Sequence, residues 1–162
     1  EKILLRRNLL QVPEDRVRIH LGLTYRKMGK YDEAIDAFAS VNPEERVNKN
    51  AFAYAGLASV YRSLSESLES SDEEKQKAFS KAEKMAEEAL VIDPTLIYAK
   101  TILIKLYEIE GKHDPVKMEQ AFSMATDTLL EDESNWYLQG LVGSMKGKKS
   151  TTEAESHFRK AI

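Results

Sequence analysis

The sequence lacks several features that would point to particular classes of protein. No cysteine occurs among its 162 residues, which excludes disulfide bonds, zinc–thiolate sites, iron–sulfur clusters and cysteine nucleophiles. Its apolar stretches are a handful of residues long, far below the roughly 20 residues that a membrane-spanning helix needs. Charge of one sign is not in excess, because 24 basic residues stand against 27 acidic ones and give a formal net charge of −3. This balance argues against a dedicated binder of polyanions.

Prolines are few, and they divide the chain into helical stretches. The four prolines stand at positions 13, 43, 94 and 115. The stretches between them carry apolar residues at three- and four-residue spacing, and none alternates strictly as a strand would. The sequence therefore predicts an all-α fold in which short links join sequential helices into antiparallel hairpins. About nine helices are expected, over residues 1–11, 14–28, 31–41, 48–69, 72–92, 95–110, 115–130, 133–146 and 150–161.

Local signals mark several helix ends. Ser71 and Glu74 have the spacing of a capping box, which satisfies free backbone N–H groups at a helix start. Gly29, Gly111 and Gly147 each follow a helical stretch, and we expect each to end its helix in the left-handed conformation that glycine adopts readily.

A pattern of small and large residues recurs along the chain. It first reads Leu21-Gly22-x2-Tyr25 and, after a turn, Ala34-x3-Phe38-x2-Val41. Small residues let two helix backbones approach closely, while large ones fill the gap to the next unit, so the units must stack. The further copies are Leu57-Ala58-x2-Tyr61 with Ala82-x3-Ala86-x2-Ala89, then Leu103-Ile104-x2-Tyr107, and last Trp136-x2-Gln139-Gly140 with Ala154-x3-Phe158-x2-Ala161.

This pattern resembles the tetratricopeptide repeat, whose helix pairs carry W-x2-L-G-x2-Y followed by A-x3-F-x2-A and a proline. The resemblance covers essentially the whole chain and implies a single domain, a right-handed α-solenoid of helix hairpins. The implied units are residues 15–48, 51–96, 97–132 and 133–162, with residues 1–13 as the second helix of a preceding unit. For the second helix of the third unit we favour Met118-x3-Phe122-x2-Ala125 over Ala121-x3-Ala125-x2-Thr128, because it keeps the family's distance to Trp136.

The second unit is longer than the others. From Tyr61 to Ala82 is 21 residues, whereas the matching span from Tyr25 to Ala34 is 9, so 12 residues are inserted. Apolar stripes continue through the insertion on both sides, which predicts about six extra residues on each helix and a projecting hairpin. The alternative is that the serine-rich run forms a loose, exposed loop.

The chain offers little catalytic or metal-binding chemistry. Its three histidines, His20, His113 and His157, share no ligand spacing, and no catalytic motif is present. Acidic pairs such as Asp32-Glu33 stand at helix starts, where the helix dipole explains them. We therefore expect no enzymatic activity, no metal and no cofactor.

The resemblance also implies where a partner would bind. In this family the first helix of each hairpin lines a concave groove that holds extended peptides. We expect Phe52, Tyr98 and Tyr137 to anchor the partner, and Arg16, Arg26, Arg62 and Lys105 to orient acidic groups on it. Some of the predicted side chains could instead pack between units. The full predicted set is Arg16, Ile19, Leu23, Arg26, Phe52, Ser59, Arg62, Tyr98, Thr101, Lys105, Tyr137, Leu141 and Met145.

One subtype of the family grips the C-terminal carboxylate of heat-shock chaperones with a fixed set of Lys, Asn and Arg. The positions that match are Ile19, Leu23, Gly56, Tyr98 and Ile102, or, shifted by one unit, Ala55, Ser59, Ile102, Ser134 and Leu138. Neither set can form that clamp, so binding of this kind is disfavoured.

Two other functions remain open at this point. The chain could be an assembly or regulatory segment of a larger protein or enzyme, which self-association through terminal helices would reveal. Binding of RNA is a weaker alternative, motivated by a net charge of +5 over residues 1–30 and opposed by the overall charge of −3. No signal peptide is visible, and we expect a cytoplasmic protein that does not insert into membranes.

Overall fold

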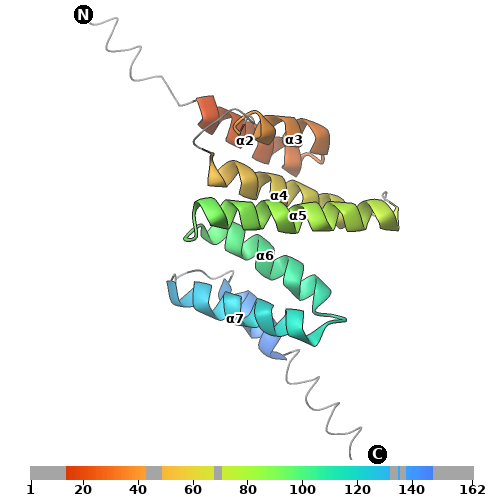
Figure 1. The fold of residues 1–162 in the computed structure, drawn as a ribbon, viewed down its shortest axis with the longest axis vertical. Coiled ribbons are helices and arrows are strands. Elements are labelled where there is room, and N and C mark those ends of the chain that lie inside the picture. Colours follow the sequence, from red (N-terminus) through yellow and green to blue (C-terminus); the bar gives the residue numbers. More distant parts are fainter. Residues whose placement is uncertain (1–13, 43–48, 68–70, 132–134, 136–137, 148–162) are drawn as a thin grey trace, which may run out of the picture. The chain divides into compact units, whose positions relative to one another are not determined.

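A computed structural model describes residues 14–42, 49–67, 71–131, 135 and 138–147 (Figure 1). These residues form seven helical segments and no strand, so the prediction of an all-α fold is confirmed for the described part. The prediction of about nine helices is not matched, because the helices expected at 1–11 and 150–161 lie outside the described residues. The helices are α2 (Glu14–Lys27), α3 (Tyr31–Ala39), α4 (Ala51–Ser65), α5 (Asp72–Ile92), α6 (Ile97–Glu110), α7 (Pro115–Glu131) and residues 138–147.

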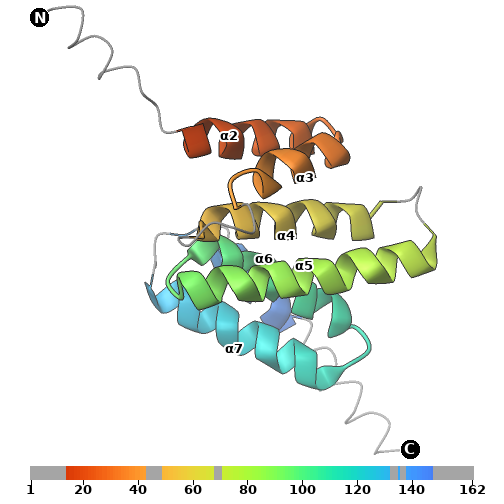
Figure 2. The ribbon, with the colours of Figure 1, turned by 45° about the horizontal axis from the view of Figure 1, so that its top comes forward.

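The chain divides into two compact units, residues 1–102 and 103–162, with the boundary inside α6. Among the described helices, none has the length and apolar character that crossing a membrane would require. In the first unit, α2 packs on α3, α3 on α4, and α4 on α5 (Figure 2). The largest of these contacts joins α4 to α5.

The core of the first unit centres on one aromatic ring. Phe38 of α3 is fully buried and clusters with Ala34, Leu57 and Val60. Its ring fits against two glycines, Gly22 of α2 and Gly56 of α4, where a Cβ atom would stand 2.7 Å and 2.3 Å from ring carbons. Because no side chain fits at either place, the small residues are required for the close packing of α2, α3 and α4.

Backbone geometry tests the predicted helix ends. Gly29 has a φ of +73°, so its predicted left-handed conformation is confirmed. Gly111 follows α6 as predicted, but its φ is not positive, and the left-handed prediction is wrong there. A Cβ atom on Gly111 would instead stand 2.8 Å from Cα of Met118. Glycine is needed at this turn because the backbone of α7 passes beside it.

The start of α5 carries the predicted capping box. The backbone N–H of Ser71 donates to Oε2 of Glu74 at 2.9 Å, and the backbone N–H of Glu74 donates to Oγ of Ser71 at 3.3 Å. The hydrogen bond from the Ser71 backbone, followed by the one from its side chain, lowers the pKa of the exposed Glu74 carboxyl below its ordinary value of 4.5.

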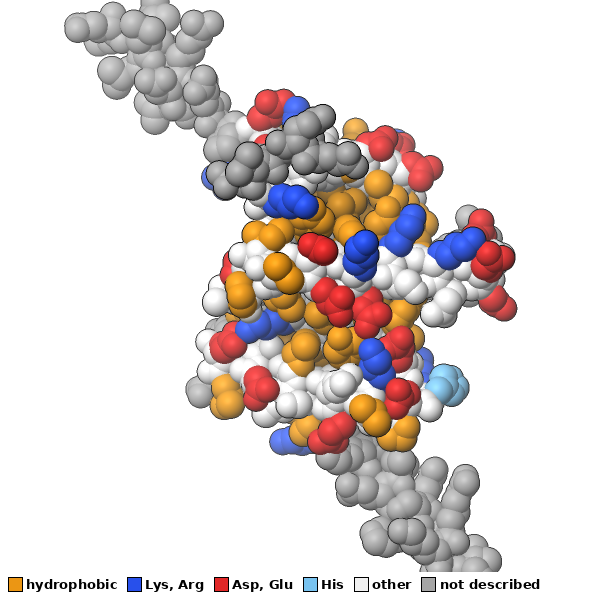
Figure 3. Space-filling model, in the orientation of Figure 1, with side chains coloured by type: hydrophobic (Ala, Val, Ile, Leu, Met, Phe, Trp, Pro, Cys, Tyr) orange, Lys and Arg blue, Asp and Glu red, His pale blue; other side chains and the backbone are white. Residues whose placement is uncertain are grey.

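The insertion in the second unit lengthens one helix far more than the other. α5 begins at Asp72, ten residues before Ala82, whereas α3 begins only three residues before Ala34. By contrast, α4 ends at Ser65, well short of the predicted residue 69. The prediction of about six extra residues on each helix is therefore wrong: about two turns are added to α5, α4 gains little, and the link takes the rest. The added end of α5 is exposed and charged (Figure 3).

Burial identifies the register of α7 in the second unit. Ala34 and Phe38 of α3 and Val41, two residues after its end, are fully buried, and α5 buries Ala82, Ala86 and Ala89 at the same spacing. In α7 the residues buried at this spacing are Ala121, Ala125 and Thr128, while Met118 and Phe122 are half-exposed. The favoured alignment on Met118 is thus wrong, and the alternative on Ala121 describes the packing.

Gly140 is the small residue that was expected to allow close helix approach in the last unit. It lies in the helical residues 138–147 and is exposed, and a Cβ atom built on it meets no atom within 4 Å in the described part of the chain. The helix expected to face Gly140, over residues 150–161, lies outside the described residues.

Candidate functional site

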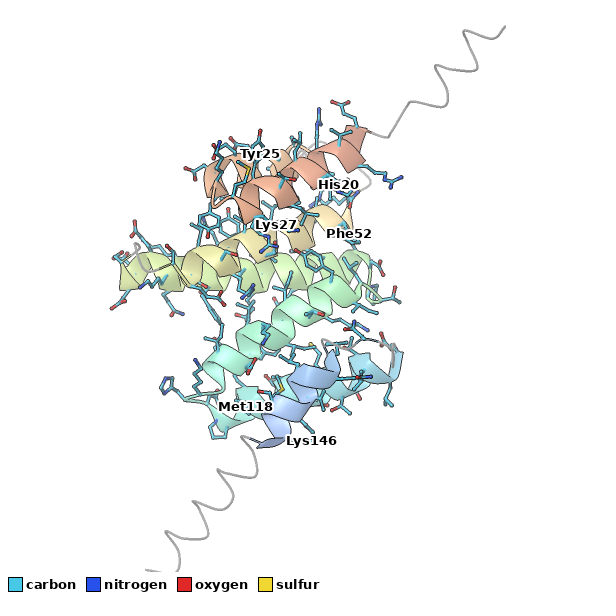
Figure 4. All side chains as sticks on the ribbon, turned by 180° about the vertical axis from the view of Figure 1, so that it is seen from behind. His20, Tyr25, Lys27, Phe52, Met118 and Lys146 are labelled. Atoms are coloured by element: carbon cyan, nitrogen blue, oxygen red, sulfur yellow. The ribbon has the colours of Figure 1, made fainter. Side chains whose placement is uncertain are left out.

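Most of the predicted groove residues lie on three helices of the first unit. α2 carries Arg16, Ile19, Leu23 and Arg26; α4 carries Phe52, Ser59 and Arg62; and the start of α6 carries Tyr98 and Thr101. We call these nine residues the first-helix face. α2 and α4 are in contact, and Figure 4 shows this side of the molecule with Phe52 labelled at the start of α4. Of the other four, Lys105, Leu141 and Met145 belong to the second unit, and Tyr137 lies outside the described residues.

The structure brings two predicted anchors together. The rings of Phe52 and Tyr98 stack with their centroids 5.8 Å apart and their planes 24° from parallel. Offset stacking of this kind stabilises an aromatic pair beyond the area that it buries. Phe52 is 45% exposed although its ring is large and apolar. The pair therefore offers an apolar, partly open platform formed by α4 and α6.

Two short polar networks fix where the aromatic residues sit. The side chain of Asn50 accepts hydrogen bonds from the backbone N–H groups of Phe52 at 2.9 Å and Ala53 at 3.3 Å, which caps α4. Asn42 holds Asn50 in turn: its Nδ2 donates to the carbonyl of Asn50 at 2.9 Å, and its Oδ1 accepts from the Asn50 backbone N–H at 2.6 Å. Phe52 is thus the second residue of a helix whose start is held from both sides.

Tyr98 is also the second residue of its helix. The turn before α6 is closed by Asp93, whose carboxylate accepts from the Thr95 backbone N–H at 2.9 Å and from the Thr95 hydroxyl at 2.7 Å. Our sequence analysis missed these positioning residues. Asn50 was readable, because Asn before a helical stretch is a preferred N-cap, but the bond from Asn42 depends on a fold that brings the two residues together.

The predicted cations differ in their availability. Arg16 is exposed on α2. Arg62 pairs with Glu66 at 2.6 Å, and Lys105 pairs with Glu108 at 3.1 Å. Because each of these charges already pairs with an acidic residue three or four positions later in the chain, a partner would have to compete for them. Arg26 is half-buried, and its Nε is a buried donor without a partner in the described structure, as is the hydroxyl of Tyr98.

Several predicted groove side chains pack inside the protein. Ile19 and Leu23 are partly buried against the Phe38 cluster. Ser59 is 3% exposed, and its hydroxyl donates to the carbonyl of Gly56 at 2.7 Å. In the second unit Leu141 and Met145 are buried as well. The side chains of Ser59, Leu141 and Met145 therefore do not offer an open surface, because the contacts of neighbouring residues already cover them.

The described residues offer no candidate metal-binding site. They contain no group of three or more His, Asp or Glu side chains that could hold a metal ion. His20 and His113 are both exposed, on α2 and on the turn after α6.

Comparison with known proteins matches one stretch of the chain to a family model. Residues 15–41 match the family described as tetratricopeptide repeat, which confirms the resemblance inferred from the sequence. No curated protein matched the chain by sequence. The chain contains a tetratricopeptide repeat, and the solved structures that it is similar to are domains of this kind.

Two solved structures illustrate the similarity. One is described as the first TPR of Spaghetti (RPAP3) bound to the HSP90 peptide SRMEEVD; it has a TM-score of 0.63 and 20% identity and covers 85% of this chain and 96% of that one. The other is the first TPR domain of the human RPAP3 protein, with a TM-score of 0.64 and 20% identity, covering 86% of this chain and 95% of that one. At this identity, the similarity establishes the fold.

Proposed function

We propose that this chain is a protein-interaction scaffold, a single tetratricopeptide-like domain that binds a partner peptide on its first-helix face, without catalysis or cofactor. The stacked pair of Phe52 and Tyr98 carries the proposal. A rigid aromatic platform that is partly open is the kind of residue cluster that dominates binding energy at protein interfaces. In this proposal the helix pairs form a right-handed solenoid whose first helices line the concave side.

The platform suggests the chemistry of the partner. An apolar or aromatic side chain of the partner would pack against Phe52 and Tyr98, because burying their exposed area is favourable. Arg16, exposed on α2, would orient an acidic group of the same partner. Arg62 and Lys105 contribute less to this proposal than Arg16, since each already has an acidic neighbour.

The similar domain of Spaghetti is bound to an HSP90 peptide that ends in EEVD. We do not transfer that ligand to this chain. At the positions that would have to supply a carboxylate clamp, this chain carries Ile19, Leu23, Gly56, Tyr98 and Ile102, and none of these side chains bears a positive charge. A terminal carboxylate buried there without a cation would lose its hydration without compensation.

A peptide selected on the immobilised chain from a random display library provides the test. We expect Phe52→Ala and Tyr98→Ala each to weaken its binding about thirtyfold, equivalent to about 2 kcal/mol, as truncation of an interface anchor does. Val91→Ala is the matched control, because Val91 is 79% exposed on the second helix α5. Equal dissociation constants for all three variants, measured by calorimetry, would refute the proposed site.

The peptide SRMEEVD tests the partner chemistry separately. We expect it not to saturate the chain at concentrations that saturate the selected peptide. Tight binding of SRMEEVD that survives Phe52→Ala would instead favour a carboxylate site built from residues outside the first-helix face.

A further inference from the structure

The end of helix α2 carries two cations that have no acidic partner. Within the described part of the chain, the side chains of Arg26 and Lys27 make no ion pair and no hydrogen bond. Arg26 is half-buried with its Nε enclosed, whereas Lys27 is exposed. A cation that has lost part of its hydration without gaining a counter-ion is unfavourable. We call Arg26 and Lys27 the basic corner.

The next repeat shows which group the basic corner lacks. In the repeat alignment, Arg26 corresponds to Arg62 and Lys30 corresponds to Glu66. The second unit neutralises its arginine from within, because Arg62 pairs with Glu66 at 2.6 Å. The first unit has a lysine where that glutamate would stand, so the positive charge of Arg26 is reinforced instead. The missing group is therefore a carboxylate, and the described chain does not supply it.

The basic corner and the aromatic platform lie at opposite ends of the first-helix face. α2 and α4 run in the same direction (Figures 1 and 2), and the repeat alignment places Arg16, near the start of α2, level with Phe52. Figure 4 shows Lys27 displaced from Phe52 toward the end of α4. From Arg16 to Arg26 is ten residues of helix, which is about 15 Å along the axis.

This separation sets a spacing for an extended peptide. Neighbouring helix axes are about 9 Å apart, so the path from Phe52 to Arg26 is about 17 Å in all. An extended chain advances about 3.3 Å per residue. A peptide that reaches both ends therefore has about five residues between its two contacts.

We propose that the basic corner binds an Asp or Glu side chain of the partner peptide, about four to six residues from the side chain that packs on Phe52 and Tyr98. The proposal rests on the proposed function and adds to it the spacing between an apolar anchor and an acidic residue. A carboxylate would accept charge-assisted hydrogen bonds from the Arg26 guanidinium and the Lys27 ammonium group. Because Arg26 is already partly desolvated, pairing costs it less further hydration than it costs the exposed Arg16.

A glutamate scan of the peptide selected on the immobilised chain tests the spacing. Its anchor is the apolar residue whose replacement by Ala weakens binding to the parent chain but not to Phe52→Ala. Every acidic residue of the peptide is changed to its amide, and one Glu is then placed at each position on either side of the anchor. We expect Glu to tighten binding about tenfold, and only at about four to six residues from the anchor. An affinity that does not depend on the position of Glu, or a maximum outside this range, would overturn the proposal.

Protein variants assign the effect to the basic corner. We expect the preference for the best-placed Glu, measured by calorimetry, to be lost in Arg26→Gln and reduced about threefold in Lys27→Gln. Glutamine keeps a helix propensity close to that of arginine and lysine. Lys84→Gln is the matched control, since it removes one positive charge from an exposed position of α5 and should leave the preference intact. A preference that survives in both Arg26→Gln and Lys27→Gln would overturn the proposal. If Arg26→Gln lowers the helical circular dichroism, Lys27→Gln, at an exposed position, decides the question.

Failure of the proposed function would give a different result. If Phe52→Ala does not weaken binding of the selected peptide, the platform is not the site and both proposals are refuted. If Phe52→Ala weakens binding while the position of Glu makes no difference, the platform stands and the basic corner alone is refuted.

Discussion

A Cβ atom on Gly56 would stand 2.3 Å from Cε1 of Phe38, a distance that real atoms in contact do not reach. The first unit therefore requires a glycine in the interior of α4, where glycine is otherwise the least favourable residue after proline. The ring of Phe38 gains complete burial from this arrangement. Gly22 of α2 leaves the same room for the other edge of the Phe38 ring.

We expect Gly56→Ala to destabilise the protein. Overpacking costs about 1–3 kcal/mol, and the better helix propensity of alanine returns about 1 kcal/mol. The free energy of unfolding should therefore fall by roughly 1 kcal/mol, as measured by urea denaturation.

Gly140→Ala is the control for this substitution, because Gly140 is helical and no described atom lies within 4 Å of its Cβ position. There we expect a gain of about 0.5–1 kcal/mol from helix propensity alone. Phe38→Leu should remove part of the clash in the Gly56→Ala background. If Gly56→Ala and Gly140→Ala change the stability equally, the packing argument is wrong.

The register of α7 makes a prediction for the second unit. Ala121 is fully buried on this helix, whereas Ser123, two residues later, is exposed. Ala121→Leu should cost about 1–3 kcal/mol of stability because it forces extra methyl groups into a packed face. Ser123→Leu should change the free energy of unfolding by less than about 0.5 kcal/mol. A loss of stability from Ser123→Leu as large as that from Ala121→Leu would contradict the register on Ala121.

Local chemistry explains which features could be read from the sequence. The capping box of Ser71 and Glu74 and the turn at Gly29 were predictable, because the groups that form them are neighbours in the chain. The stacked pair was predicted only as two separate anchors, since Phe52 and Tyr98 are far apart in sequence. Gly111 shows the limit most clearly: a glycine after a helix suggested a left-handed turn, and the actual reason is the approach of Met118.

The prediction of how the lengthened hairpin divides its extra residues was wrong for a related reason. Apolar spacing showed that helical structure continues on both sides of the insertion, but it could not divide the extra residues between two helices. The division follows from the cap at Ser71, which starts α5 at Asp72, and from the end of α4 at Ser65. Because the first turns of α5 bury almost nothing before Ala78, no core pattern marked their length.

Asn50 links the stability of α4 to the proposed platform. Asn50→Ala removes the side-chain acceptor for the N–H groups of Phe52 and Ala53. Loss of an N-cap of this kind costs about 1 kcal/mol. We expect amide hydrogen exchange to accelerate in the first turn of α4. We also expect the selected peptide to bind more weakly, although no residue proposed to contact it is changed. Ser65→Ala, at the last residue of the same helix, should leave both readouts as they are.

The capping box of α5 predicts a dependence of stability on pH. Hydrogen bonds from Ser71 lower the pKa of the Glu74 carboxyl in the folded state. A lowered pKa means that the folded protein favours the ionised carboxylate. The stabilisation is therefore fully present above the ordinary value of 4.5 and is lost as the pH falls through the lowered pKa of the folded state.

Carbon-13 titration of the Glu74 carboxyl by NMR measures this directly. We expect a midpoint below the ordinary value in the parent chain and a return toward it in Ser71→Ala, because both hydrogen bonds that the Ser71 side chain makes to Glu74 are lost and the cap loosens. Ser80→Ala should leave the midpoint unchanged, since the Ser80 hydroxyl bonds to the carbonyl of Gln76 in the same helix. A Glu74 midpoint that does not respond to Ser71→Ala would mean that the backbone N–H of residue 71, and not the Ser71 side chain, holds this pKa down.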